Sequence, residues 1–175
     1  VYSVRERDPQ TEMRVVDNDN GASLAGQGEY IEKNMPVKKW EDLDCGTKGF
    51  AMPKLPMYSK SNPFLSGTAR QISTTERDDH ATASWIPTFD KAGKYAVYVS
   101  YATVPNSVSD ALYIVKHKGQ ETKFRINQQM GGGTWVYLGT FDFDKNDPKN
   151  NCVILSNQSK EDGVVTADAV RWGGG

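Results

Sequence analysis

The sequence predicts an all-β fold, an antiparallel β-sandwich, from three observations. Short segments rich in Val, Ile, Tyr, Phe and Trp recur between turn signals along most of the chain. No ten-residue window carries a convincing helical stripe of apolar residues. The connections between the segments are too short for crossover helices, which disfavours a parallel sheet. With 175 residues, the chain is long enough to form one such domain with a full core.

The predicted strands are apolar or alternating segments, most of them bounded by Gly, Pro, Asn or Asp. In chain order they are MRVVD at 13–17, ATASWIP at 81–87, KYAVYVSYA at 94–102, ALYIVKH at 111–117, TKFRINQ at 122–128, TWVYLGTFDF at 134–143, NCVILSN at 151–157 and VVTADAVRW at 164–172. We expect a single sandwich domain over 13–172, with 1–12 and 173–175 as linkers, cut from a longer precursor.

Between residues 30 and 80 the strand pattern dissolves into a segment with four prolines, which predicts a long loop excursion. Its aromatic residues, Trp40 and Tyr58 among them, indicate a packed excursion, since disordered segments are poor in aromatics. Within it, VKKWEDLD at 37–44 is compatible with a turn or two of helix.

Loop positions predict where a binding site would lie. Simple up-and-down pairing from Ala81 onward would gather the connections at 60–80, 103–110, 129–134 and 157–163 at one end of the sandwich. Loops held on a rigid scaffold commonly carry binding groups. We therefore expect the binding site at this loop end.

Charge and hydropathy exclude two classes of partner. The 21 basic and 22 acidic residues are scattered and give a formal charge of −1, so no nucleic-acid or anionic-membrane surface is expected. No apolar run approaches the roughly 18 residues of a membrane span, so no membrane insertion is expected.

The two cysteines, Cys45 and Cys152, lie far apart and show no metal-binding spacing. A buried free thiol at Cys152 is favoured over a disulfide with Cys45, because an isolated cysteine in an apolar strand packs as a small hydrophobe. The disulfide remains the alternative.

Catalytic motifs give little support for an enzyme. Of the two histidines, His80 follows Asp78 and Asp79, but no serine lies in a nucleophile elbow, and His117 is expected at a strand end on the surface. A glycosidase-type pair of catalytic carboxylates stays an alternative, because among 22 acidic residues some pair always lies at a suitable separation. An autonomous hydrolase or lyase is therefore the least favoured interpretation.

Aromatic side chains near the loop end suggest sugar binding. Sugars present apolar faces and hydroxyl edges, so a glycan site needs a flat ring beside Asn, Gln, Asp or Arg. In the segment 94–102, one face including Tyr101 is expected in the core and Tyr98 points outward. Tyr101 lies beside the loop end, and Trp135 directly follows the glycine run at 131–133.

Six motifs occur in a specific order and span about half of the chain. They are Gly93-Lys94-Tyr95, Asn127-Gln128, Gly132-Gly133-Thr134-Trp135, Leu138-Gly139-Thr140-Phe141, Leu155-Ser156-Asn157 and Ala167-Asp168-Ala169-Val170-Arg171-Trp172. As an ordered set they resemble the golvesin C-terminal and xanthan-lyase carbohydrate-binding-like domain. Two departures from the family pattern, Asn106-Ser107-Val108 in place of Asn-Arg-Ala and a longer stretch at 30–64, mean that ligand identity does not carry over.

The resemblance implies a jelly-roll-like β-sandwich without catalysis of its own, appended to secreted bacterial enzymes that act on polysaccharide or cell wall. It implies a polysaccharide or cell-wall glycan as ligand and a neighbouring catalytic domain of the same polypeptide as partner. It also implies an extracellular, periplasmic or cell-surface location. A label such as xanthan lyase would then describe the neighbour.

We predict a carbohydrate-binding site at the loop end, closed by aromatic residues of the excursion. Its residues are Tyr101, Asn106, Asp110, Trp135, Asn157, Trp40 and Tyr58. The alternative from another class is an interaction domain that docks onto a neighbouring catalytic domain and binds no sugar. That alternative predicts that the aromatics of the excursion are buried in the fold or form one apolar patch.

Asp168 lies between two alanines in the last predicted strand, where an unpaired buried carboxylate would cost several kcal/mol. It is therefore expected to pair with Arg171 or another arginine, with backbone N–H groups, or through a structural calcium ion shared with Asp17 or Asp19. A salt bridge or backbone hydrogen bonds are favoured over calcium. No other cofactor is expected.

Overall fold

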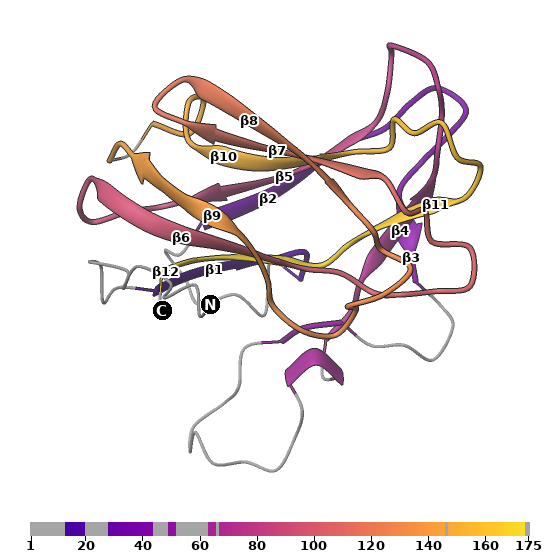
Figure 1. Cartoon of the computed structure of the whole chain (residues 1–175), viewed down its shortest axis with the longest axis horizontal. Coiled ribbons are helices and arrows are strands. Elements are labelled where there is room, and N and C mark those ends of the chain that lie inside the picture. The colour runs from indigo at the N-terminus through magenta and orange to yellow at the C-terminus, as the bar shows by residue number, and fades with distance from the viewer. Residues whose placement is uncertain are drawn as a thin grey trace, which may run out of the picture.

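Two antiparallel sheets lie face to face in the computed structural model, which describes residues 13–19, 28–43, 49–51, 63–65, 67–145 and 147–173 (Figure 1). The four-stranded sheet has the order β1 (Met13–Asp17), β12 (Ala169–Gly173), β6 (Gly93–Ser100) and β9 (Val136–Phe143). The five-stranded sheet has the order β2 (Gly28–Lys33), β5 (Thr82–Pro87), β10 (Cys152–Ser156), β7 (Ala111–His117) and β8 (Gln120–Ile126). The all-β sandwich prediction is confirmed.

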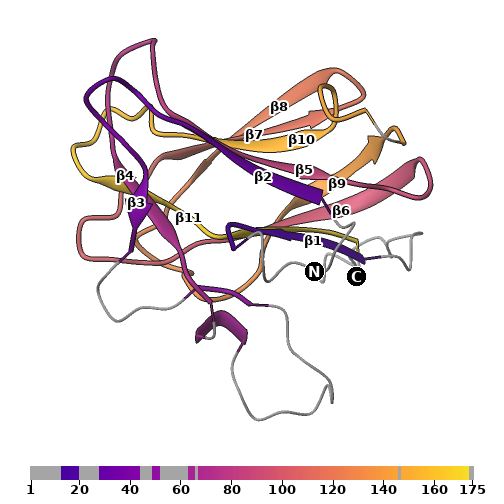
Figure 2. The same cartoon turned by 180° about the vertical axis from the view of Figure 1, so that it is seen from behind.

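A third, small sheet lies at one end of the sandwich, as the view from behind shows (Figure 2). It has the order β11 (Val164–Ala167), β4 (Arg70–Ser73) and β3 (Glu41–Asp42). The described residues contain one short 3₁₀ helix, η1 (Pro63–Leu65), and none of them form a helix long and apolar enough to cross a membrane.

The core between the two large sheets follows from strand alternation. On β6, Tyr95, Val97 and Val99 are buried on the inner face, as predicted, because side chains of a strand point alternately to its two faces. Trp85 of β5 and Trp172 of β12 are also fully buried in this core. Cys152 is a buried free cysteine, which confirms the favoured interpretation; Cys45 lies outside the described residues.

The last predicted strand, 164–172, is divided in two at Asp168. Its first half, β11, pairs with β4 in the small sheet, whereas its second half, β12, pairs with β1 and β6 in the four-stranded sheet. The Asp168 carbonyl accepts hydrogen bonds from Asn18 N at 3.0 Å and from the Trp85 indole Nε1 at 3.1 Å. Asp168 is therefore the residue at which the chain passes from one sheet to another.

Three expectations about organisation need correction. Within 30–80 the chain forms most of β2, and all of β3 and β4. These strands were not predicted because a short segment with a single buried apolar residue, such as Ile72 of β4, shows no alternating pattern in the sequence. Residues 37–43 contain no helix and end in β3. Strands β5 and β6 are consecutive but lie in different sheets, so simple up-and-down pairing is wrong.

The loop end nevertheless exists, because the chain alternates between the two ends of the sandwich even when it changes sheet. Ser109 N donates to Glu161 Oε1 at 3.1 Å, and Gly132 N donates to Thr103 Oγ1 at 3.0 Å. Thr75 N donates to Asn157 O at 3.0 Å. These bonds join the four predicted connections.

Replacing Trp85 by Phe should lower the free energy of unfolding by about 1–3 kcal/mol. The variant leaves a gap in the core and removes a hydrogen bond from the buried Asp168 carbonyl. Urea unfolding measures the change, and Val37→Ala at an exposed position is the control, expected within about 0.5 kcal/mol of wild type. Equal stability of Trp85→Phe and wild type would contradict this role of the indole.

Candidate functional site

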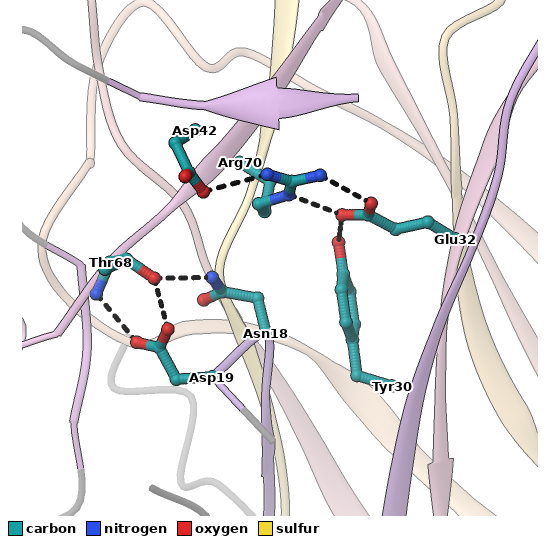
Figure 3. Close-up of a pocket in the computed structure, with 7 residues that line it drawn as sticks. All are labelled: Asn18, Asp19, Tyr30, Glu32, Asp42, Thr68 and Arg70. Atoms are coloured by element: carbon teal, nitrogen blue, oxygen red, sulfur yellow. Dashed lines mark hydrogen bonds and ion pairs between the residues drawn. The ribbon is translucent and has the colours of Figure 1, made fainter. Parts of the chain in front are cut away.

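A polar pocket with a volume of about 320 Å³ opens where the ends of β1 and β2 meet the small sheet (Figure 3). All of its lining residues carry hydrogen-bonding groups, and four segments of the chain supply them. They are Asn18, Asp19, Tyr30, Glu32, Asp42, Thr68 and Arg70.

The Arg70 guanidinium organises one wall of the pocket. Its Nε and Nη2 donate to the two oxygens of Glu32, each at 2.8 Å, in a bidentate pair. Nη1 donates to Asp42 Oδ1 at 2.8 Å, and Nη2 also donates to the Trp40 carbonyl at 3.2 Å. These bonds fix the guanidinium across β2, β3 and β4, so the wall is preorganised.

The opposite wall is built around Thr68. Its N–H donates to Asp19 Oδ2 at 2.8 Å, its hydroxyl bonds the other oxygen of Asp19, and the Asn18 side-chain amide lies 2.9 Å from that hydroxyl. At the back of the pocket, the Tyr30 hydroxyl donates to Glu32 Oε2 at 2.7 Å.

Two groups of the pocket have shifted pKa values. Burial, with help from the hydrogen bond to Glu32, raises the pKa of Tyr30 well above its ordinary value. The hydrogen bond to Glu32 raises the pKa of Arg70 further, against a smaller opposing effect of burial. At neutral pH the Tyr30 hydroxyl is therefore a neutral donor and Arg70 is a permanent cation.

The sequence analysis missed this pocket apart from Asp19. Its residues come from positions 18 to 70, and strands β3 and β4 that hold Asp42 and Arg70 were not predicted. The alternation of Tyr30 and Glu32 in GEYIEK was a usable signal, because it places both side chains on one face of a strand.

Three residues of the predicted glycan site are buried by the fold. Tyr101 is covered, and its hydroxyl donates to Met130 O at 2.7 Å. Trp40 is buried with Nε1 donating to Thr82 O at 3.1 Å. The Asn157 side chain is buried and joins Ala81 N, at 2.8 Å, to Ser73 O, at 2.9 Å. These groups hold loops together and present no face to solvent.

The other predicted residues lie apart from one another. Asn106 is exposed on the rim of a second cavity of about 300 Å³, which Asp42 also lines. Asp110 is partly exposed and accepts from the Ser159 hydroxyl. Tyr58 lies outside the described residues.

Trp135 belongs to an aromatic strip on the outer face of the four-stranded sheet, which we define as Tyr137, Tyr98, Arg171 and Trp135. Val170 and Trp172 point into the core, so Arg171 between them points outward, and it faces Tyr98 across the strand pair. The guanidinium carbon lies 4.1 Å from the Tyr98 ring centroid and 5.3 Å from that of Trp135. The ring centroids of Tyr98 and Tyr137 lie 5.3 Å apart, which extends the row to Tyr137.

Most of the strip is covered: Tyr98, which was predicted to point outward, lies on the outer face but is only 5% exposed, and Trp135 is partly buried. Trp135 packs against Phe50 and Phe64, with ring centroids 5.0 and 5.6 Å away, in a small apolar cluster outside the main core. Tyr137 is 44% exposed, and its hydroxyl shares a hydrogen bond of 2.8 Å with Thr140 Oγ1. Tyr137 is therefore the aromatic side chain of the strip that is exposed to solvent.

The buried carboxylate of Asp168 is satisfied by hydrogen bonds. Phe50 N donates to its two oxygens at 3.0 and 2.9 Å, and Ser100 Oγ donates to Oδ2 at 3.1 Å. Gly49 permits this approach, since a Cβ there would stand 2.8 Å from Asp168 Oδ1 and 2.0 Å from Thr68 O. Of the expected alternatives, backbone hydrogen bonding is the one observed, and no described arginine forms an ion pair with Asp168.

Burial raises the pKa values of both Asp17 and Asp168 above the ordinary value of an aspartate. Burial, followed by the nearby charge of Asp168, raises the pKa of Asp17 to about 9. Burial raises the pKa of Asp168 to about 7, against the opposing effect of the Phe50 and Ser100 hydrogen bonds. The two carboxyls share one buried region, so ionising both is costly.

Calcium binding by Asp17, Asp19 and Asp168 stays a prediction. Within the described residues, no group of three or more Asp, Glu, His or Cys side chains is arranged to hold a metal ion. Asp19 already accepts from Thr68, and Asp168 accepts from Phe50 and Ser100. The three carboxylates therefore do not fit a shared ion in this arrangement.

Comparison with known proteins identifies relatives of the chain. The model of the Golvesin C-terminal domain family matches residues 60–173, more than half of the sequence. A xanthan lyase of Bacillus sp. (strain GL1) is 28% identical over 138 residues, which are 69% of this chain and 15% of that protein.

Solved structures extend the comparison to the fold. A Paenibacillus xanthan lyase aligns with a TM-score of 0.61 and 22% identity, covering 93% of this chain and 13% of that one. A family 11 carbohydrate-binding module of Clostridium thermocellum covers 93% of this chain and 95% of its own with 10% identity, but its TM-score of 0.46 is too low to support an argument. The chain thus spans only a small part of the xanthan lyases that it matches.

The free energy of unfolding should fall as pH rises from about 4 towards 9. The folded-state pKa of Asp17, about 9, lies above the ordinary value of 3.8, so in this range unfolding releases a proton. Asp17→Asn should make the profile less steep, with the contribution of Asp168 remaining below about pH 7, and should be more stable than wild type at pH 8, as measured by urea unfolding. Asp90→Asn, at a largely exposed carboxylate, should leave the slope unchanged. Parallel profiles for Asp17→Asn and wild type would refute the assignment.

If Asp17, Asp19 and Asp168 do bind calcium, the melting temperature should rise by roughly 5–10 °C at a calcium concentration about 100 times the Kd. EDTA should reverse the rise and Asp19→Asn should abolish it. A melting temperature that is unaffected by calcium and EDTA would exclude a structural calcium ion.

Proposed function

Since the chain belongs to the Golvesin C-terminal domain family, we propose that it is a non-catalytic, carbohydrate-binding accessory module of a larger secreted bacterial protein that acts on polysaccharide or cell wall. The relationship to part of a xanthan lyase supports such a setting, because the matched region is a small fraction of an enzyme chain. The partner within the polypeptide would be a neighbouring catalytic domain, and the location extracellular, periplasmic or at the cell surface.

The aromatic strip is the observation that carries the proposal. The apolar C–H face of a pyranose ring packs on a flat aromatic side chain, and the fixed Tyr137 ring offers such a surface. The Arg171 guanidinium packs on the Tyr98 ring, which in turn packs on Tyr137, and so helps to fix the orientation of the Tyr137 ring. A shallow open strip of this kind favours weak, enthalpic binding of a polysaccharide chain.

The absence of a catalytic role is supported by the environment of the histidines. His80 Nδ1 lies 2.8 Å from Ser156 Oγ, which is the contact a serine hydrolase would need. Ser156, however, is fully buried, and its hydroxyl accepts from Gln158 N at 3.0 Å. A substrate has no access to that oxygen, so the pair serves the loop structure.

A domain that docks onto its catalytic neighbour without binding sugar is the second candidate. Burial of Trp40 and Phe50 in the fold favours it, since this interpretation predicts buried excursion aromatics. It predicts no sugar binding and a measurable complex with the neighbouring domain. A glycan screen with calcium and with EDTA therefore separates the two candidates.

Replacing Tyr137 by Ala should weaken glycan binding at least about tenfold, which corresponds to the loss of one aromatic contact. The ligand is first identified on an array of acidic exopolysaccharides, peptidoglycan fragments, and plant and host glycans, and affinity is then measured by calorimetry. Trp135→Ala should also abolish binding but lowers stability, because Trp135 packs on Phe50 and Phe64.

Met130→Ala is the matched control, since Met130 is an exposed apolar side chain outside the strip. It should bind as wild type does. Undiminished glycan binding by Tyr137→Ala would refute the strip as the binding site. If wild type binds no glycan of the panel, the docking role is favoured.

A further inference from the structure

The pocket around Arg70 retains hydrogen-bonding capacity beyond what the protein uses. A guanidinium has five N–H donors, and four are occupied: Nε by Glu32, both on Nη2 by Glu32 and Trp40 O, and one on Nη1 by Asp42. The second N–H of Nη1 has no partner among the described residues. Among the residues that the structure describes, Asp42 likewise bonds through Oδ1 alone, which leaves Oδ2 as an open acceptor.

We infer that this pocket is a second sugar subsite, in which Asp42 Oδ2 and Arg70 Nη1 bind two neighbouring hydroxyls of one neutral sugar residue. This inference rests on the proposed function and adds a site and a ligand class to it. One hydroxyl donates to the carboxylate and the adjacent hydroxyl accepts from the guanidinium. The ion pair holds both protein groups 2.8 Å apart, so donor and acceptor are presented together.

The size and exposure of the pocket agree with the binding of one sugar residue of a glycan chain. Its volume of about 320 Å³ lies at the lower end of the range for small-molecule pockets. Asp42 stands at its mouth with 78% of its side chain exposed, and it also lines the adjacent cavity that contains Asn106. A glycan chain can therefore enter the pocket from solvent without rearrangement of the Arg70 wall.

Charge sets the ligand class. The pocket combines three carboxylates, Asp19, Glu32 and Asp42, with one guanidinium, for a formal charge of −2. The positive charge of Arg70 is already shared between Glu32 and Asp42. A uronate or another acidic sugar would meet net repulsion, whereas a neutral sugar meets none.

Calorimetry with cellotetraose, mannotetraose and tetragalacturonate tests the inference. Wild type should bind at least one neutral tetrasaccharide tenfold or more tightly than tetragalacturonate. Asp42→Ala should weaken binding of the neutral tetrasaccharide at least tenfold. Asp42→Asn should reduce the difference in affinity between the neutral tetrasaccharide and tetragalacturonate. Thermal melting checks that both variants remain folded, as expected for an exposed side chain.

Asp90→Ala is the matched control. Asp90 pairs with Arg14 at 2.8 Å and its side chain is 72% exposed, so it reproduces the ion pair of Asp42 away from the pocket. Equal affinities of Asp42→Ala and Asp90→Ala, with binding still lost in Tyr137→Ala, would overturn the pocket and leave the proposed function standing. Tighter binding of tetragalacturonate than of both neutral ligands would overturn the ligand class. No binding of any sugar by wild type would count against the proposed function itself.

Discussion

The hydrogen bonds of Asp168 join the parts of this domain that are far apart in sequence. Its carboxylate receives Phe50 N–H from the excursion and the Ser100 hydroxyl from the end of β6. Its carbonyl receives Asn18 N–H and the Trp85 indole. The division of the last strand at this residue lets β11 join the small sheet while β12 completes the four-stranded one. Asp168 is thus a buried polar residue that ties the excursion to both large parts of the sandwich, together with the bonds of Thr68 to Asp19 and of Arg70 to Glu32.

Both candidate binding surfaces depend on that anchoring. Phe50, held by Asp168, packs on Trp135 and so supports one end of the aromatic strip. The antiparallel bridge between Gly49 and Gly67 continues into Thr68 and Arg70, which form two walls of the polar pocket. The excursion is therefore a structural part of the sites, and its polar and aromatic residues serve different surfaces.

Burial of the Asp17 and Asp168 side chains opposes their ionisation. Asp17 and Asp168 lie in a region that disfavours charge, and at Asp168 the Phe50 N–H and the Ser100 hydroxyl oppose this effect. The donors that stabilise the carboxylate come from the excursion and from β6, so docking of the excursion and the protonation of this region are coupled.

The sequence by itself determined most of the strands and which of their residues face the core, because alternation of apolar residues is a local property; β1 and β7 begin and end at the predicted residues. It also identified Asp168 as a residue that needs partners. Only the tertiary structure decided which partners it has, that Tyr101, Trp40 and Asn157 are buried, and that Arg70 meets Glu32 and Asp42. The physical reason is that hydrogen bonds and burial depend on residues distant in the chain, and β3 and β4 carry too few apolar residues to be seen locally.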